Sequence, residues 1–238
     1  MQSNTHATHR QYKYYDFILV AFVVVLLCSN LIGPAKIAQI ELPIVGLVTF
    51  GAGILFFPIS YLFSDILTEV YGYNRDRRAV WSGFASLLFA SIMAFIVVHL
   101  PAASFWENHQ PAIETVFGNT WRIVLASLIA FWCGSFANSF IMAKMKIMTH
   151  GKHLWSRTIG STLVGELIDS ALFYSIAFIG LMSTEQLITL ILTQYALKTS
   201  WEIIATPATY WIVNTLKKVE NEDHYDRHTH FTPFSIQL

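Results

Sequence analysis

The chain has 238 residues, of which 54% are hydrophobic and only 13% are charged, and its 15 basic side chains balance its 15 acidic ones. With a mean hydropathy of +0.49, this composition lies outside the range of soluble domains, in which about 25% of residues are charged. The polar ends, residues 1–15 and 217–238, are too short to bury a core of their own. The composition therefore excludes a soluble domain and predicts an integral membrane protein.

Apolar windows of about 20 residues, the length that crosses about 30 Å of hydrocarbon, predict an all-α protein with six transmembrane helices. These helices cover residues 16–33, 44–71, 79–100, 121–145, 158–182 and 186–214. Pro58 and Pro207 interrupt the second and the sixth, where we expect kinks or short breaks. The membrane domain runs over residues 16–216, between an N-terminal tail (1–15) and a C-terminal tail (217–238).

Basic residues gather in alternate loops, as the positive-inside rule requires. One side holds Arg10, Lys13, Arg75, Arg77, Arg78, Lys144, Lys146, Lys152, Arg157, Lys217, Lys218 and Arg227. The opposite loops hold only Lys36 and Arg122. Both termini are therefore predicted to be cytoplasmic.

The histidines of the C-terminal tail are interpreted as part of a solvated tail rather than as a metal site. Neither Cys28 nor Cys133 implies a disulfide or a metal.

Polar residues inside the spans are the main functional signal, because an ionisable group in hydrocarbon costs several kcal/mol unless it faces a partner, water or a ligand. At 100° per residue, four spans each place polar or small residues on one face. These are Tyr61, Ser64, Asp65, Thr68, Glu69 and Gly72; Ser127, Phe131, Gly134 and Asn138; Thr158, Thr162, Gly165 and Asp169; and Gln194, Tyr195, Lys198, Glu202, Thr206 and Thr209. Ser161 and Gly165 form a small-xxx-small pair, which most often marks close helix packing. We expect the polar faces to share one interior.

The charges of this interior do not balance. Five acids (Asp65, Glu69, Glu166, Asp169 and Glu202) accompany one base, Lys198. Lys198 is expected to pair with Glu202 on its own helix or with Asp169 or Glu166 on the neighbouring one. The other acids must be protonated, paired with the cytoplasmic arginines, or supplied with hydrogen-bond donors by a ligand.

Each of these features also has a purely structural interpretation. Asp65 and Glu69 could form an ion-pair lock with Arg75, Arg77 and Arg78 that only fixes a loop. The Lys198–Asp169 pair could be a structural bridge, and Trp132 could serve packing rather than stacking.

Several stretches together resemble a known family. Residues 53–83, "GILFFPISYLFSDILTEVYGYNRDRRAVWSG", carry its hallmark pattern of FP, Y, D, TE, YGY and a basic cluster. "SNLIGPAKI", "FANSFIMAKMK", "WSRTIGSTLVGELIDSALFYSIAF" and "YALKTSWEIIATPATY" match in order along the chain. The likeness covers nearly all of the chain except the tails. On these residues the sequence resembles the queuosine precursor transporter family, also called the vitamin uptake transporter family.

The resemblance implies a multi-pass protein of the bacterial inner membrane, with a fold similar to the substrate-binding subunits of energy-coupling-factor transporters. It implies import of 7-cyano-7-deazaguanine or 7-aminomethyl-7-deazaguanine for salvage into tRNA modification, and we expect a gradient to drive it. A buried carboxylate can accept the adjacent N–H groups of such a base, and an acidic interior would also favour the cation of the aminomethyl form. No enzyme activity, cofactor or nucleic-acid partner is expected, and both a monomer and a homodimer fit the sequence.

The matching stretches supply the candidate site residues. The predicted base-binding set is Glu166, Asp169, Lys198, Glu202, Asn138 and Asn30, with Trp132 or Tyr195 stacking on the base. Within it, Lys198 sets the charge of the acids and hydrogen bonds to a base carbonyl. Asp65, Glu69, Arg75, Arg77 and Arg78 are predicted to form a cytoplasmic gate or a proton-responsive lock.

Two rival classes are weighed beside transport by this chain alone. One is a passive binding subunit that needs an ATP-driven partner; its usual Ala-xxx-Ala face is missing from the first span, which has only Ala21. The other is an intramembrane aspartyl protease using Asp65 and Asp169, but "GELI" precedes Asp169 where Gly-x-Gly is expected. No phosphate-binding glycine loop occurs, so the chain itself is not expected to hydrolyse nucleotide.

Overall fold

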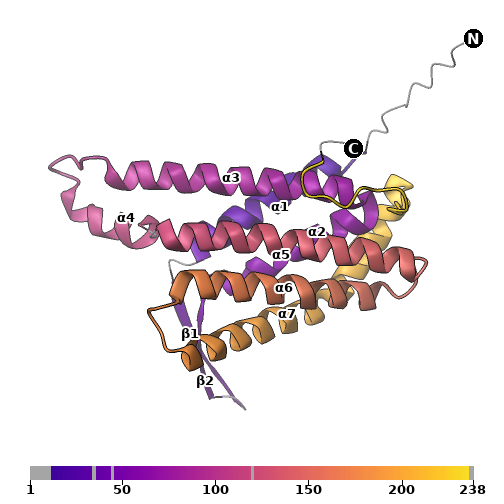
Figure 1. Cartoon of the computed structure of the whole chain (residues 1–238). Coiled ribbons are helices and arrows are strands. Elements are labelled where there is room, and N and C mark those ends of the chain that lie inside the picture. The colour runs from indigo at the N-terminus through magenta and orange to yellow at the C-terminus, as the bar shows by residue number, and fades with distance from the viewer. Residues whose placement is uncertain (1–11, 34–35, 44–45, 119–120, 236–238) are drawn as a thin grey trace, which may run out of the picture.

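The computed structural model describes residues 12–33, 36–43, 46–118 and 121–235. Most of the predicted N-terminal tail, including Arg10, lies outside these ranges, as do residues 44–45, 119–120 and 236–238. The chain forms a bundle of long helices with one small hairpin at its side (Figure 1). In chain order the elements are α1 (Tyr15–Leu27), the π-helix η1 (Cys28–Ile32), β1 (Ile37–Leu42), β2 (Gly46–Gly51), the 3-10 helix η3 (Ala52–Leu55), α2 (Phe57–Tyr71), α3 (Tyr73–His99), the 3-10 helix η4 (Glu107–His109), α4 (Gln110–Phe117), α5 (Trp121–Met148), α6 (Leu154–Phe178) and α7 (Thr184–Glu220).

Within the described ranges, five helical segments are long and apolar enough to cross a membrane. They are Tyr15–Ile32, Ala52–Tyr71, Tyr73–His99, Glu107–Met148 and Leu154–Phe178. These segments confirm the prediction of an α-helical, multi-pass membrane protein, but not the predicted number of six spans. Helix α7 has 37 residues but is not one of the five; its predicted span carries Lys198 and Glu202.

The first part of the predicted second span is a hairpin and not a helix. β1 and β2 pair antiparallel from Ile37 opposite Gly51 to Leu42 opposite Gly46, and the helix begins only at Phe57. Hydropathy cannot separate the two structures here, because the apolar run before Phe57 contains β-branched and aromatic residues that suit a strand equally well. The prediction of a helix from residue 44 was therefore wrong over Gly46–Gly51, whereas η3 and α2 supply the helical segment Ala52–Tyr71.

The two prolines do not break their helices. Pro58 lies in the first turn of α2, where a missing N–H costs no hydrogen bond. Helix α7 continues through Pro207 from Thr184 to Glu220. Beside that proline, Thr206 donates its hydroxyl to the Glu202 carbonyl at 3.0 Å, the kind of side-chain bond that accompanies proline in membrane helices. The expected short break falls just before Pro58, where the 3-10 helix η3 ends and α2 begins.

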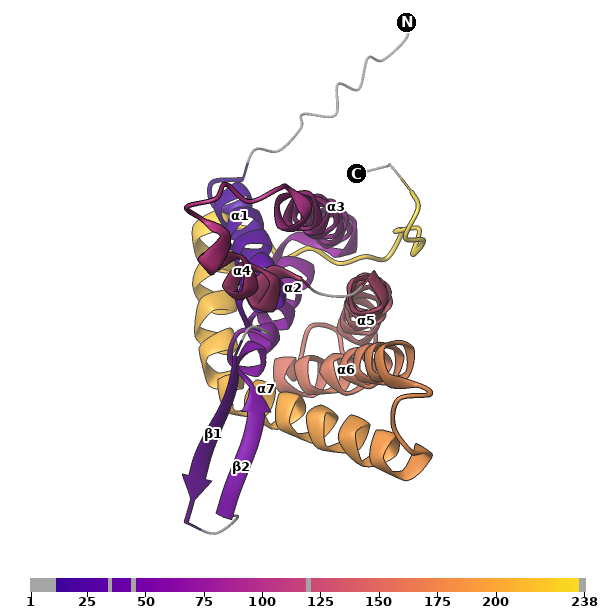
Figure 2. The same cartoon turned by 90° about the vertical axis from the view of Figure 1, so that its left-hand side faces the viewer.

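Helix α2 is the centre of the bundle. It packs against α1, α3, α5 and α7, and Figure 2 shows it among the other helices. Twelve of its fifteen residues are buried. The predicted polar face is buried as expected, but so is the opposite face, where Ile66, Leu67 and Val70 join an apolar cluster with Phe22 and Leu26 of α1. Because four helices pack around α2, its buried polar residues are shielded from lipid and are tolerated there.

Helices α5 and α6 pack closely through two glycines. A Cβ at Gly165 would lie 2.9 Å from the Asn138 Cβ and 3.0 Å from the Gly134 carbonyl oxygen. A Cβ at Gly134 would overlap the Tyr61 hydroxyl and lie 2.9 Å from the Asp169 Cβ. Small residues let the two backbones approach, so the packing role predicted for the Ser161–Gly165 pair is confirmed for Gly165.

The segment after α7, residues 221–235, is packed against the bundle. The Tyr73 amide at the start of α3 donates to Asp226 Oδ2 at 3.0 Å, and Phe231 packs against the rings of Tyr73 and Phe140. Arg77 donates to the Thr232 carbonyl at 3.0 Å. Figure 1 shows this yellow segment returning over the ends of α2 and α3. The segment therefore docks on the bundle through Asp226 and Phe231, while His228 and His230, which the sequence placed in a solvated tail, are exposed.

The charge of Asp226 is an important part of this docking. Its side chain is 1% exposed. Burial raises the pKa of Asp226, but hydrogen bonds from His224, Thr229 and the Tyr73 amide outweigh that effect and hold the pKa below its ordinary value. The docked segment is thus stabilised by an ionised carboxylate at the positive end of α3.

Candidate functional site

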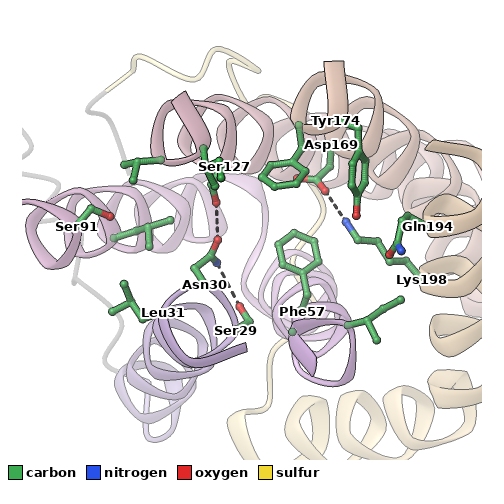
Figure 3. Close-up of a pocket in the computed structure, with 16 residues that line it drawn as sticks. Ser29, Asn30, Leu31, Phe57, Ser91, Ser127, Asp169, Tyr174, Gln194 and Lys198 are labelled. Atoms are coloured by element: carbon green, nitrogen blue, oxygen red, sulfur yellow. Dashed lines mark hydrogen bonds and ion pairs between the residues drawn. The ribbon is translucent and has the colours of Figure 1, made fainter. Parts of the chain in front are cut away.

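A cavity of about 240 Å³ lies where η1, η3, α2, α3, α5, α6 and α7 meet. Its polar lining residues are Ser29, Asn30, Ser91, Ser127, Asp169, Tyr174, Gln194 and Lys198, and its aromatic ones include Phe57 and Phe173. Figure 3 shows the polar residues in two groups, with Phe57 between them. Of the predicted base-binding set, Asn30, Asp169 and Lys198 line this cavity.

One group is centred on Lys198. Its ammonium lies 2.6 Å from Asp169 Oδ2 and 3.1 Å from Glu166 Oε2, and 4.0 Å from the centre of the Phe57 ring. Of the three partners offered to Lys198 by the sequence, the structure selects the two on α6. Asp169 and Lys198 face the cavity together, whereas Glu166 is fully buried behind them. A buried cation held by two carboxylates and a ring face is fixed in place.

Asp65 and Glu202 lie deeper in the interior. Asp65 Oδ1 accepts a hydrogen bond from Asn138 at 2.8 Å, and Glu202 Oε2 accepts one from Thr162 at 3.3 Å. Neither Glu202 Oε1 nor Glu166 Oε1 has a hydrogen-bond partner among the described residues. Buried polar atoms without partners are uncommon in stable interiors and need an explanation, such as a ligand or a transferable proton.

Glu69 belongs to a separate charge cluster near the ends of the helices. Arg157 Nε and Nη2 donate to its two oxygens at 2.8 and 2.7 Å, Lys217 donates at 2.5 Å, and Lys146 Nζ lies 3.5 Å away. Asp223 completes the cluster, 2.6 Å from Lys146 and 2.8 Å from Lys217. Burial raises the pKa of Asp223, but the bonds from both lysines outweigh it and hold the pKa below its ordinary value. We call these five residues the Glu69 cluster.

The predicted pairing of Asp65 and Glu69 with the arginine run was therefore wrong. The Arg75 guanidinium lies over the Tyr12 ring at 4.4 Å, Arg77 donates to the segment after α7, and Arg78 is exposed. These arginines follow a positive-φ glycine that redirects the chain from α2 into α3. The redirection turns the run away from the acids that precede it in sequence.

Trp132, Tyr195 and Asn138 do not line the cavity. Trp132 packs against the rings of Trp81, Phe136 and Phe234, so the stacking surfaces at the cavity belong to other aromatic residues. Gln194 and Ser127 were on the polar faces read from the sequence but were not singled out. Their positions on the faces that also carry Lys198 and Asn138 were the signal that could have found them.

Asp76 is a buried acid that the sequence analysis did not identify. Asp76 is 0% exposed; it accepts a hydrogen bond from Ser64 at 2.9 Å and another from Ser139. In the sequence it stands inside the basic run "NRDRR" and reads as part of a polar loop. Because α3 already begins at Tyr73, Asp76 is in its first turn and points into the bundle.

Comparison with known proteins decides the family. Residues 51–212 match the family model described as "Putative vitamin uptake transporter". The chain belongs to this family. A "Probable queuosine precursor transporter" of Bacillus subtilis (strain 168) is 30% identical over 82% of this chain and 81% of its own length. The "Queuosine precursor transporter" of Escherichia coli (strain K12) is 23% identical over 74% of this chain and 73% of its own length.

A third relative, the "Probable queuosine precursor transporter" of Haemophilus influenzae, is 24% identical over 53% of this chain and 51% of its own length. No solved structure matches the chain. The family and the relatives are described as transporters and not as enzymes. The aspartyl-protease alternative is therefore set aside.

Proposed function

We propose that this vitamin uptake transporter family member imports queuosine precursors, 7-cyano- or 7-aminomethyl-7-deazaguanine, across the bacterial inner membrane. The proposal includes six membrane spans, with α7 as the sixth, both termini in the cytoplasm, and a fold similar to the substrate-binding subunits of energy-coupling-factor transporters. The names of the relatives support the substrate class. The alternating distribution of basic residues supports the orientation.

The observation that carries the proposal is the pairing of Asp169 and Lys198 at the wall of the cavity, beside the face of Phe57. A guanine-like base presents adjacent N–H donors next to a carbonyl acceptor. The carboxylate accepts from the former, the ammonium donates to the latter, and charge-assisted bonds of both kinds are strong. The cavity, about 240 Å³, is smaller than the roughly 300–1,000 Å³ of pockets for drug-sized ligands, so it suits a small bicyclic base.

In this proposal each predicted residue has a role that follows from its position at the cavity or behind it. Asp169 contacts the base, Lys198 hydrogen bonds to its carbonyl, and Phe57 stacks on it in the place first assigned to Trp132 or Tyr195. Glu166 holds Lys198 from behind at 3.1 Å. Glu202, with one unpartnered oxygen among the described residues, acts from the interior on the charge of the site.

Uptake is proposed to be driven by an ion gradient. The described interior includes the carboxyl groups of Asp65, Asp76, Glu166, Asp169 and Glu202, and one ammonium, that of Lys198, contacts two of them. Such a group cannot be fully ionised in a low-dielectric interior, so it provides places for a transported proton. The Glu69 cluster, which joins α2, α5, α6, α7 and the segment after it, is proposed as the cytoplasmic gate.

The test is uptake of labelled precursors into cells that cannot synthesise them and that express only this chain, with and without a protonophore. We expect uptake that collapses with the proton gradient, and a loss of at least about tenfold in the Asp169→Asn variant, which removes a charge-assisted contact. Asp16→Asn, the same change at an exposed position in the first turn of α1, is the matched control and should retain uptake.

Absence of both uptake and binding by the purified chain would refute the proposal. Binding without uptake would replace it with the passive binding subunit that needs an ATP-driven partner.

A further inference from the structure

The second polar group of the cavity lies on the other side of Phe57 from Lys198 and consists of Ser29, Asn30 and Ser127 (Figure 3). Asn30 connects its members. Its amide nitrogen donates to the Leu26 carbonyl at 2.9 Å and to Ser29 Oγ at 3.2 Å, and its Oδ1 accepts from Ser127 Oγ at 2.5 Å. We call these three side chains the Asn30 cluster.

The hydrogen positions in this cluster follow from the bonds themselves. A carbonyl oxygen can only accept, so the Asn30 atom that faces Leu26 must be the amide nitrogen, which fixes the orientation of the amide. For the same reason Ser29, which lies 2.9 Å from the Leu26 carbonyl, must donate to it. Ser127 has to donate to Asn30 Oδ1, because once the amide orientation is fixed the atom facing Ser127 is a carbonyl oxygen, which can only accept.

The Asn30 cluster therefore has no donor left for a ligand. Both amide hydrogens and both hydroxyl hydrogens are engaged within it or with Leu26, while Ser29 Oγ, Ser127 Oγ and Asn30 Oδ1 keep lone pairs. Ser91 is on the same side of Phe57 (Figure 3), but its hydroxyl can turn either to donate or to accept and so does not select between ligands. The two ends of the cavity thus differ in kind: Lys198 and Asp169 offer both a donor and an acceptor, whereas the Asn30 cluster offers acceptors only.

We propose that the Asn30 cluster selects substrates that carry an amino or ammonium group, so that the chain prefers the 7-aminomethyl base over the 7-cyano base. The inference rests on the proposed function and deepens it. An ammonium group donates to the three oxygens and lies away from the like charge of Lys198. A nitrile nitrogen has only a lone pair, and it would face the lone pairs of the cluster without a hydrogen bond.

The test is calorimetric titration of the purified full-length chain with each of the two bases. We expect the aminomethyl base to bind about tenfold or more tightly, since one hydrogen bond to a charged group is worth that much. Asn30→Leu should reduce this ratio to near one, because it removes one acceptor and releases the Ser127 hydroxyl to donate to the nitrile. A residue that only supported the fold would weaken both bases alike and leave the ratio unchanged.

Two further variants provide a matched control and a second test of the Asn30 cluster. Asn214→Leu, the same change at an exposed position of α7, should leave the ratio as it is. Ser127→Ala is a smaller change that should lower the ratio in the same direction, and it decides the matter if Asn30→Leu does not fold.

Equal affinity for the two bases, tighter binding of the cyano base, or a ratio unchanged by both cluster variants would overturn this inference while leaving the proposed function intact. Failure of the unmodified chain to bind either base would overturn both.

Discussion

Replacement of Glu69 by glutamine tests whether the Glu69 cluster holds the helices together. The Glu69 side chain is fully buried, and it is the partner of an Arg157 side chain that is 1% exposed. Removal of one member of a buried ion pair costs about 3–5 kcal/mol, because the other charge is left uncompensated. Lys146 and Lys217 keep Asp223 as a partner, so the loss falls mainly on Arg157. We therefore expect the lower end of that range, about 3 kcal/mol.

The measurement is thermal unfolding of the purified protein in detergent, followed by tryptophan fluorescence. For a chain of this size, a loss of about 3 kcal/mol corresponds to a fall in Tm of roughly 6–12 °C. Glu107→Gln makes the same chemical change at an exposed position of η4 and should cost within about 0.5 kcal/mol. A Glu69→Gln protein that melts within about 2 °C of the unmodified chain would refute the reasoning, because the charges would then not be joining the helices.

Three further predictions follow from the packing and the charges. The carboxylate of Asp226 has a lower pKa in the folded state, so it stabilises that state fully above the unfolded pKa of about 3.9 and loses this effect as the pH falls through the folded pKa. Limited proteolysis should therefore cut residues 221–235 slowly at pH 7 and faster below about pH 4. The Asp226→Asn variant should be cut quickly at both pH values. Gly165→Val should lower the Tm strongly by separating α5 from α6, whereas Gly160→Ala, which meets only the flexible end of a methionine, should not, as calorimetry in detergent would show. Lys198→Met should reduce base binding by more than about tenfold in isothermal titration, since it removes a charge-assisted donor; affinity equal to that of the unmodified chain would contradict the assigned role.

Much of the membrane architecture is readable from local sequence. Apolar windows found the cores of α1, α3, α5 and α6 because burial in hydrocarbon requires about 20 apolar residues whatever the neighbouring helices are. They failed over Gly46–Gly51, where a strand and a helix have similar hydropathy and only pairing with β1 decides between them. Helical periodicity also identified Asp169 and Lys198 as residues of polar faces, and both line the cavity.

The sequence predicted the ion-pair partners of the buried charged residues only in part. The sequence offered Lys198 three carboxylates, and the packing of α7 on α6 selected two of them. It offered Glu69 the nearby arginines, but the partners come from residues 88 and 148 positions away in the chain. The acceptor-only Asn30 cluster likewise joins residues 97 positions apart.

The sequence by itself determined that this is a membrane protein, which residues lie within its apolar segments, which side chains share a helix face, and which family it resembles, because all of these depend on composition, local periodicity and motif spacing. Only the tertiary structure decided which charges meet, where the cavity lies, and that residues 221–235 dock on the bundle. The physical reason is that a helix face constrains the direction of its side chains but not the rotation or the height at which another helix crosses it. Those two quantities set every distance between groups on different helices.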